Sequence, residues 1–308
     1  MIVFRLLFVI SSIVTINENV LCYTCRPIKA AILVEAKTGE VIYSFNENKQ
    51  TQPASLTKMM TLLLTFKALK NKQISPSTRI KFSQNACKQK PCKLGVKKGC
   101  SISVKEAVLA LITKSANDVA VALAEHIGKT EGNFVKMMNA EAKRLGMKST
   151  VFFNPSGWKN TKQLTTVKDM AKLSRALIVE YPGYYHLFST KQFIYGRKKM
   201  RNHNMLLGQR CGFLVDGIKT GFVNASGYNL AASATKGKNR LIAIVLGGRS
   251  RYERDRQVQA LLKRGFSKII SRSILEKINS KQTKKSKMPY LHNRSGIYNK
   301  LQLLSKGE

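Results

Sequence analysis

The most constraining feature of the sequence is the segment 53–64, PASLTKMMTLLL, in which a serine and a lysine precede an apolar run. A helix that starts near Ala54 makes Ser55 and Lys58 neighbours, since side chains three positions apart lie on one helix face. A serine hydroxyl becomes a nucleophile when a base takes its proton, and a lysine held neutral by apolar surroundings or by a nearby cation is such a base. The four-residue pattern alone also fits an ordinary helix start with a solvated lysine. Partners elsewhere in the chain decide between these interpretations.

Hydrophobic patterning predicts strands at both ends of the chain and helices between them. The strands are expected at 29–35 and 40–44, which form a hairpin, and at 193–195, 227–234 and 240–247. The helices are expected over 54–72, 104–112, 119–125, 132–145, 165–178 and 258–270, and residues 78–104 read as a loop. This order predicts an α+β fold, with an antiparallel sheet flanked by helices and a helical subdomain.

The two ends of the chain predict export and a basic tail. Residues 1–24 place one arginine before a short apolar run, which is typical of a secretory signal; an uncleaved anchor is the alternative, and lipidation at Cys22 is a weaker one. The interpretation is an exported protein of the periplasm, with association with the inner membrane left open. We assign residues 25–272 to one catalytic domain and 273–308 to a basic, mostly mobile tail.

The formal net charge of +38 indicates attraction to polyanions, because 54 Lys and Arg oppose only 16 Asp and Glu. Anionic lipid or wall polymers are the partners this charge suggests. Nucleic acid is a rival, but the chain contains no zinc-finger spacing, RNP-type segment or clear helix-turn-helix pattern. We therefore expect no specific nucleic-acid partner.

Six cysteines are present, and three of them, Cys87, Cys92 and Cys100, are close enough in sequence for a disulfide within one loop. Cys22 and Cys25 straddle the expected cleavage region, and no second pair or histidine cluster completes a zinc site. The sequence predicts no metal and no cofactor.

Two further motifs follow the serine and lysine in chain order. Ser115-Ala116-Asn117 lies in a break between two predicted helices, and Lys219-Thr220-Gly221 precedes a predicted hairpin strand. The set S-x-x-K, S-x-N and K-T-G is typical of serine acyl-transfer sites in penicillin-binding proteins and class A β-lactamases. Three motifs in this order favour catalysis over a solvated lysine.

The residues around these motifs resemble those of the low-molecular-mass penicillin-binding proteins that are serine D-alanyl-D-alanine carboxypeptidases, peptidase family S11. The resemblance covers about residues 28–270 and includes the segments 53–60, 115–125, 202–207 and 215–221. No Glu-x-x-Leu-Asn segment is present, which points away from class A β-lactamases. The resemblance implies the penicillin-binding protein / β-lactamase-like fold and removal of the terminal D-alanine from peptidoglycan stem pentapeptides.

The resemblance also implies a role for each catalytic residue. Ser55 attacks the carbonyl of the penultimate D-alanine, and Lys58, whose pKa is lowered by Lys219, accepts the Ser55 proton. Ser115 relays a proton to the departing D-alanine. Asn117 holds Lys58 and the substrate amide in place. β-Lactam antibiotics are then covalent inhibitors that acylate Ser55. A D,D-endopeptidase acting on cross-links, or an idle protein that binds wall polymers, are the alternatives.

Substrate binding is expected along the third motif. Lys219 keeps the potential positive, Thr220 binds the terminal carboxylate, and Gly221 leaves access to the strand edge. The backbone N–H groups of Ser55 and Phe222 form the oxyanion hole. Arg254 falls where the family places a carboxylate-directed arginine, although Arg249 and Arg251 compete for that role. We expect His203 to support the site without being its base, Asp118 to cap a helix and Asp216 to bind nearby backbone.

Overall fold

The computed structural model describes residues 28–158, 160–209 and 211–286. The expected signal segment and residues 287–308 of the expected tail lie outside this range. The strands are β1 (Ala30–Glu35), β2 (Val41–Phe45), β3 (Arg79–Lys81), β4 (Ser101–Ser103), β5 (Gln192–Tyr195), β6 (Lys198–Arg201), β7 (Leu214–Val223), β8 (Gly227–Lys236) and β9 (Asn239–Gly248). The helices are η2 (Ala54–Thr57), α2 (Lys58–Lys70), α3 (Gln84–Lys88), α4 (Val104–Thr113), α5 (Asn117–Gly128), α6 (Glu131–Arg144), α7 (Val167–Val179), α8 (Pro182–Tyr185), η3 (His186–Ser189) and α9 (Arg251–Ser286).

A five-stranded antiparallel sheet joins the two ends of the chain. Its strand order is β2-β1-β9-β8-β7, so β1 from the start of the chain pairs with β9 from the end. This confirms the predicted α+β arrangement with one sheet built from both ends. The order leaves β7, which contains the Lys219-Thr220-Gly221 motif, as an edge strand.

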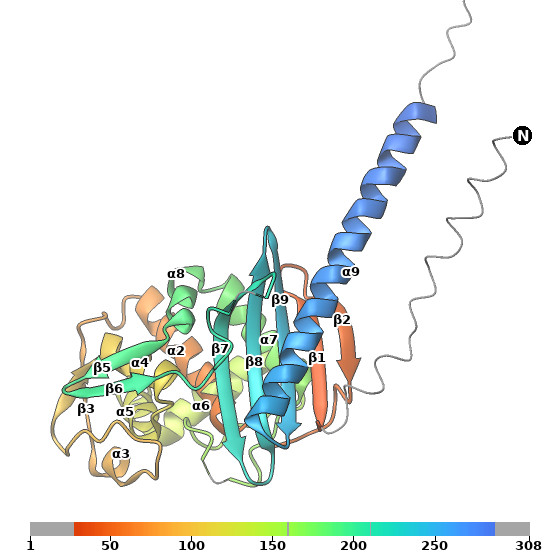
Figure 1. The fold of residues 1–308 in the computed structure, drawn as a ribbon. Coiled ribbons are helices and arrows are strands. Elements are labelled where there is room, and N and C mark those ends of the chain that lie inside the picture. The colour runs from red at the N-terminus through yellow and green to blue at the C-terminus, as the bar shows by residue number, and fades with distance from the viewer. Residues whose placement is uncertain (1–27, 159, 210, 287–308) are drawn as a thin grey trace, which may run out of the picture. The chain divides into compact units, whose positions relative to one another are not determined.

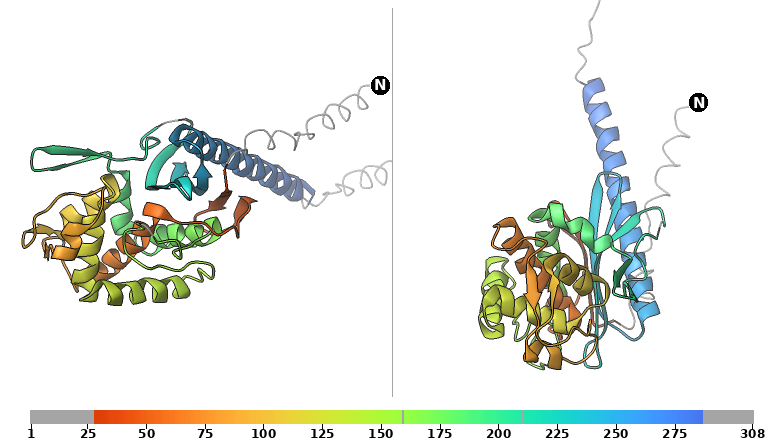
Figure 2. Two further views of the ribbon diagram at one scale, coloured as in Figure 1. Left: turned by 90° about the horizontal axis from the view of Figure 1, so that it is seen from below. Right: turned by 90° about the vertical axis from the view of Figure 1, so that its left-hand side faces the viewer.

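The two faces of the sheet are covered by different helices because successive side chains along a strand point to opposite sides. Ile32 and Ile242 belong to the main core, on the face against which α7 packs. Leu33 and Leu241 face the first part of α9, where a Cβ at Gly265 would lie 2.6 Å from Leu33 Cδ2. Figure 2 shows the helical cluster and the start of α9 on opposite sides of the sheet. Both faces are therefore covered, and the sheet ends in two edge strands, β2 on one side and β7 on the other.

Helix α2 forms the centre of the helical cluster. Every residue from Lys58 to Phe66 is buried, including Met59, Leu62 and Phe66, which have no exposed surface. A helix that is apolar on all sides must be surrounded by other elements. This burial fixes the first residue of α2 inside the protein, and that residue is Lys58.

Side-chain caps mark the start of several helices. Ser103 and Glu106 form a capping box at α4, and Thr166 Oγ1 accepts a hydrogen bond from Asp169 N at 3.1 Å at the start of α7.

The predicted helix over 258–270 is part of a longer helix, α9, which continues to Ser286. The segment from 273, expected to be mostly mobile, is thus helical as far as it is described. The expected loop over 78–104 is wrong in part, because it contains β3, α3 and β4. Strand β6 and the short helices α8 and η3 were not predicted either.

Contacts divide the chain after Phe266 into two units, and the described part of the second is the remainder of α9. Within the described residues no helix is both long enough and apolar enough to cross a bilayer.

The four cysteines in the described part of the chain are free thiols: Cys87, Cys92, Cys100 and Cys211. The disulfide considered within the 87–100 loop therefore does not form in this structure.

Candidate active site

Ser55 and Lys58 lie side by side at the junction of η2 and α2, as the spacing predicts. Lys58 Nζ is 3.0 Å from Ser55 Oγ. Ser55 lies in the 3-10 turn and Lys58 is the first residue of α2, so a single helical turn sets their separation. The hydroxyl is close enough to pass its proton directly to the amine.

The surroundings of Lys58 fit a neutral amine. Its side chain is fully buried, and Nζ also donates to Asn117 Oδ1 at 2.7 Å and to the Ser156 carbonyl at 2.6 Å. A neutral amine has two N–H groups and one lone pair. Both carbonyl oxygens can only accept, so they take the two hydrogens and leave the lone pair for the Ser55 hydroxyl, which can donate.

Burial holds the pKa of Lys58 well below its ordinary value, and the charge of Lys219 lowers that pKa further. The sequence interpretation attributed the lowered pKa to Lys219, but desolvation by the core around α2 is the larger cause. No carboxylate is among the three hydrogen-bond partners of Lys58. These surroundings therefore favour the neutral form of the amine, which is the form that can act as a base.

Asn117, the first residue of α5, is held in place by the preceding loop. Its Nδ2 donates to the Lys90 carbonyl at 2.9 Å and its backbone N to the Cys92 carbonyl at 2.7 Å. The first bond turns the amide so that Oδ1 faces Lys58. The 90–92 segment, which the sequence interpretation left as part of a loop, thus positions a side chain of the site.

Ser115 lies two residues before Asn117, in the break between α4 and α5. Its backbone has a φ of 58°, a left-handed conformation that strains a residue with a Cβ. The side chain is buried, and Oγ makes no hydrogen bond within the described part of the chain. A buried hydroxyl without a partner is free to bond a reacting group.

Lys219 reaches the site from the edge strand β7. Its side chain is buried and Nζ donates to the Thr220 carbonyl at 3.0 Å. Burial lowers the pKa of Lys219 to about 7. The charge of Arg254 lowers this pKa further, and Cys92 raises it. Since Lys219 also lowers the pKa of Lys58, the two amines are electrostatically linked across the site.

Gly221 packs against the turn that contains the serine. A Cβ on Gly221 would lie 3.2 Å from Ser55 N and 3.1 Å from the Pro53 carbonyl. The sequence interpretation placed this missing side chain between the strand edge and a ligand. The structure shows that it would instead press on the backbone of η2, so the glycine sets how closely β7 approaches Ser55.

A basic pocket lies beyond Gly221 on β7. We define it by Arg201, His203, Thr220, Phe222, Arg251 and Arg254, which line a cavity of about 370 Å³. Arg254 is buried, and its Nε donates to Asp255 Oδ1 at 2.8 Å. The structure thus brings Thr220, Phe222 and Arg254 together, in surroundings whose charge suits a carboxylate.

His203 lines this basic pocket, and Lys58 takes the place beside Ser55 that a histidine base would occupy. Desolvation, with the positive charges of Lys219, Lys114 and Arg251, lowers the pKa of His203 to about 4. The imidazole is therefore neutral near pH 7. The role of His203 as a supporting residue stays a prediction.

The turn 154–157 was not predicted to belong to the site. Asn154 Oδ1 accepts from Ser156 N at 3.1 Å and from Gly157 N at 2.7 Å, and this turn presents the Ser156 carbonyl to Lys58. Gly157 has a φ of 82°, and a Cβ there would lie 1.8 Å from the Ala54 carbonyl oxygen. An Asn-Pro-Ser-Gly sequence signals a turn, but nothing in it indicates which group the turn contacts.

Two acidic residues near the motifs have structural roles other than those predicted. Asp118 is not the cap of α5, since Ala116 holds that position; its carboxylate accepts from Leu94 N at 2.9 Å and Gly95 N at 2.8 Å. Asp216 forms an ion pair with Arg240 at 2.7 Å, and no backbone hydrogen bond to its carboxylate occurs within the part of the chain that the structure describes. No group of three metal-ligating side chains occurs in residues 28–158, 160–209 and 211–286.

A sequence model of the family described as D-alanyl-D-alanine carboxypeptidase matches residues 26–250. The chain belongs to this family. D-alanyl-D-alanine carboxypeptidase DacD of Salmonella typhimurium is 36% identical over 252 residues, which is 80% of this chain and 64% of the relative. The chain therefore spans less than two thirds of the length of that relative.

Solved structures agree with the family assignment. Penicillin binding protein 5 of Haemophilus influenzae superposes with a TM-score of 0.76 at 34% identity, over 78% of this chain and 71% of the other. Penicillin-Binding Protein D2 of Listeria monocytogenes, in its cefotaxime-bound form, has a TM-score of 0.70 at 31% identity, over 78% and 97%. The fold is thus that of the penicillin-binding proteins, as predicted.

We predict that Gly157→Ala lowers the free energy of unfolding more than a matched glycine substitution, Gly99→Ala. Gly99 has nearly the same φ, 81°, but no atom lies within 4 Å of its added Cβ. Gly99→Ala should cost the backbone strain alone, about 1–2 kcal/mol. Gly157→Ala should cost about 1–3 kcal/mol more, because the Ala54 carbonyl must move. Urea unfolding measures both values, and equal costs would contradict this contact.

Proposed function

We propose that the protein is a serine D-alanyl-D-alanine carboxypeptidase that removes the terminal D-alanine from peptidoglycan pentapeptides. The observation that supports this most directly is the fully buried Lys58 amine, 3.0 Å from Ser55 Oγ, with only uncharged hydrogen-bond partners. Such a pair is suited to forming an acyl-enzyme. Family membership supports the same reaction.

In the first step Ser55 Oγ attacks the carbonyl carbon of the penultimate D-alanine, and Lys58 Nζ takes the hydroxyl proton. The negative charge that develops on the carbonyl oxygen is stabilised by the backbone N–H groups of Ser55 and Phe222; losing one such donor typically costs about 100-fold in rate. The close contact of Gly221 with Ser55 N brings these two segments together.

In the second step the carbon–nitrogen bond breaks and the departing amine gains a proton. Ser115 relays this proton from Lys58, a role that fits its buried hydroxyl without a hydrogen-bond partner in the described chain. D-Alanine leaves, and water attacks the carbonyl carbon of the remaining ester on Ser55. Lys58 accepts a proton from this water and returns it to Ser55 Oγ as the ester bond breaks, so that the serine hydroxyl is restored.

The terminal carboxylate of the substrate binds in the basic pocket. Thr220 donates its hydroxyl hydrogen, and Arg254 and Lys219 supply positive charge. β-Lactams carry a carboxylate and a reactive carbonyl, so the same groups orient them for acylation of Ser55.

The deciding experiment is labelling of the full chain with a fluorescent penicillin, compared with Ser55→Ala. The wild type should be labelled covalently and should release D-alanine from a pentapeptide, and Ser55→Ala should do neither. Unlabelled wild-type protein would overturn the proposal. Labelling without D-alanine release would favour an endopeptidase or an idle binding protein.

We predict a pH profile of acylation that depends on both lysines. Acylation needs neutral Lys58, so the rate rises with pH, and it needs charged Lys219, so the rate falls again above about pH 7, the pKa of Lys219. Lys219→Gln removes the alkaline limb. It also moves the acid limb to higher pH, because losing the positive charge raises the pKa of Lys58.

The measurement is the rate of penicillin acylation from pH 5 to 10. Lys219→Arg is the control, because arginine stays charged throughout this range; it should lose the alkaline limb and keep the acid limb in place. An acid limb at the same pH in wild type and Lys219→Gln would disprove the link between the two amines.

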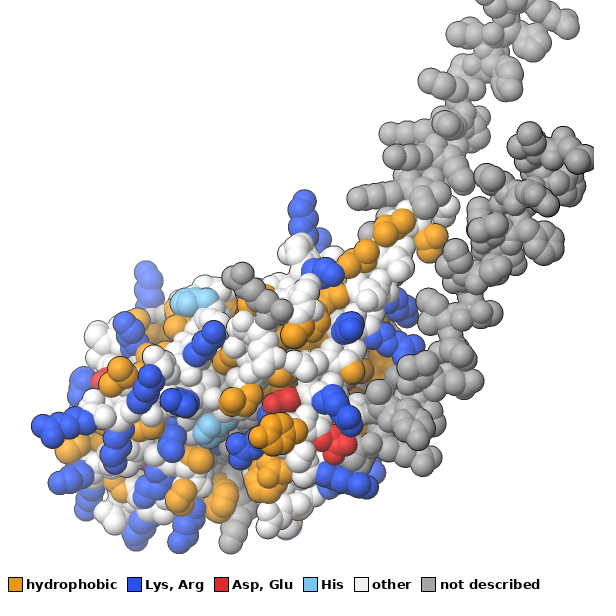
Figure 3. Space-filling model, viewed as in Figure 1, with side chains coloured by type: hydrophobic (Ala, Val, Ile, Leu, Met, Phe, Trp, Pro, Cys, Tyr) orange, Lys and Arg blue, Asp and Glu red, His pale blue; other side chains and the backbone are white. Residues whose placement is uncertain are grey.

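We further propose that the enzyme is exported and held by its positive charge near anionic lipid or wall polymers. Figure 3 shows Lys and Arg spread over one face of the molecule with few acidic side chains, as the net charge of +38 requires. Attraction of this kind amounts to about 1 kcal/mol for each basic residue near the surface and is screened by salt.

Deleting residues 274–308 should lower binding to vesicles that contain anionic lipid by about tenfold or more at low salt, since the deletion removes several lysines. Co-sedimentation measures this, with uncharged phosphatidylcholine vesicles as the control. Equal binding of both chains, or binding that does not change with salt, would argue against the proposal.

A further inference from the structure

The hairpin of β5 and β6 forms a two-stranded ribbon at the outer margin of the helical cluster (Figures 1 and 2). We call residues 191–201 the basic ribbon. Residues directly opposite each other in an antiparallel pair point to the same face, and the register pairs Phe193 with Met200 and Ile194 with Lys199. Phe193 and Met200 pack in the main core. Ile194 and Lys199 therefore lie on the outer face.

The outer face of the basic ribbon combines apolar and positively charged side chains. Ile194 is 64% exposed, and Lys199 and Arg201, which share its face, are exposed as well. Met205, just after the ribbon, is also 64% exposed. Among the Val, Ile, Leu and Met side chains of the described residues, these two are the most exposed. Single exposed apolar residues are ordinary, but two at one charged surface indicate an interaction site.

The charge of the basic ribbon is not balanced by acidic residues. The segment has no Asp or Glu and five basic side chains, Lys191, Arg197, Lys198, Lys199 and Arg201. None of the five takes part in the ion pairs found among the described residues. Figure 3 shows Lys and Arg gathered over the part of the face where Figure 1 draws β5 and β6. This surface is therefore suited to a partner that carries several negative charges.

We propose that the outer face of the basic ribbon docks on an anionic lipid bilayer. Lipid phosphates attract Lys199 and Arg201, and the boundary between headgroups and acyl chains takes up Ile194 and Met205. A soluble polyanion would satisfy the cations but would leave the two apolar side chains in water. The inference rests on the proposed attraction to anionic lipid and names the surface of the catalytic domain that makes the contact.

Docking by this surface also orients the active site. Arg201 and Met205 line the basic pocket together with Thr220 and Arg254. The docked ribbon therefore holds the mouth of the basic pocket beside the lipid headgroups.

The test is co-sedimentation of the full chain with vesicles of phosphatidylglycerol and phosphatidylcholine. Ile194→Thr keeps the charge and the β-branched shape and should lower the partition coefficient about tenfold, because the apolar contact is lost. Lys199→Gln should lower it about fivefold. Ile194→Leu keeps the apolar surface and should bind as wild type does. Both residues lie outside the lining of the basic pocket, so these changes leave its residues in place.

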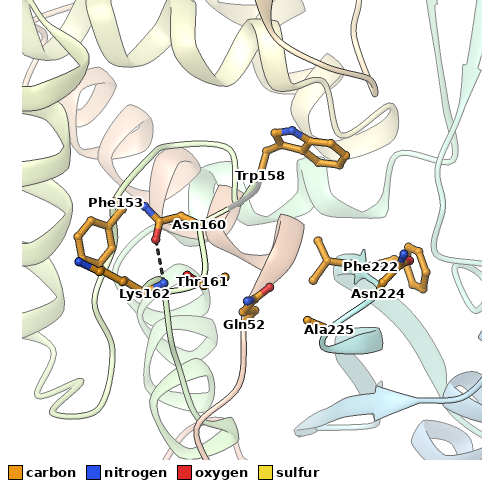
Figure 4. A pocket seen from close by; sticks show the side chains of 10 residues that line it. Gln52, Phe153, Trp158, Asn160, Thr161, Lys162, Phe222, Asn224 and Ala225 are labelled. Carbon is orange, nitrogen blue, oxygen red and sulfur yellow. Dashed lines mark hydrogen bonds between the residues drawn. The ribbon is translucent and has the colours of Figure 1, made fainter.

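Lys162→Gln is the matched control, because it removes one positive charge from an exposed lysine outside the ribbon. Lys162 lines another cavity, together with Phe153 and Trp158 (Figure 4). This variant should change vesicle binding less than twofold. Equal losses for Lys162→Gln and Lys199→Gln would overturn the inference in favour of net charge alone. Unchanged binding of Ile194→Thr would overturn it in favour of a soluble polyanion.

Insertion of the ribbon can be measured with a tryptophan in place of Ile194. Bromine atoms on acyl chains quench the fluorescence of a tryptophan that they contact. The wild-type chain contains a single tryptophan, Trp158, which supplies the baseline. With brominated vesicles, Ile194→Trp should be quenched by a larger fraction than wild type. Equal quenching of the two proteins would contradict docking by this face.

The outcomes separate this inference from the proposals on which it builds. Penicillin labelling of Ser55 at the wild-type rate shows that each variant is folded. If wild type does not sediment with anionic vesicles, both the docking and the proposed attraction to lipid are overturned. If wild type sediments and the ribbon variants sediment equally well, the docking alone is overturned. Release of D-alanine tests the carboxypeptidase proposal independently of either result.

Discussion

The structure depends on the burial of one amine. Lys58 begins a helix whose apolar residues fill the centre of the helical cluster, and a charged ammonium at that point would have to give up its hydration without a carboxylate in contact. The energetically accessible form is the neutral amine. The core of the protein therefore does more than stabilise the fold, because the same desolvation that packs α2 prepares Lys58 to act as a base.

The groups around this amine come from three separate parts of the chain, and each is fixed by backbone contacts. The 154–157 turn offers a carbonyl, the 90–92 segment orients Asn117, and β7 supplies Lys219. Strain is concentrated here as well, at the left-handed Ser115. Because β7 is an edge strand beside the turn of Ser55, the sheet topology leaves an open boundary where a peptide can lie between strand and helix.

Sequence reasoning could find the side chains of this site but not the backbone groups that support them. Spacing placed Ser55 beside Lys58, because helix geometry is local, and hydrophobic patterning placed β1 with β2. The Ser156 and Lys90 carbonyls have no residue-type signature, since every residue carries a carbonyl. The Asp216–Arg240 pair was missed because cross-strand contacts depend on register.

The position of Gly221 limits how the proposed site could change to exclude a ligand such as a β-lactam. A larger residue on the strand would be the simplest way to narrow the site against a bulky inhibitor. At Gly221, however, even one added carbon meets the backbone that holds the nucleophile, with Ser55 N at 3.2 Å. If β-lactams acylate Ser55 as proposed, excluding them by this route would also shift the serine that the proposed reaction uses.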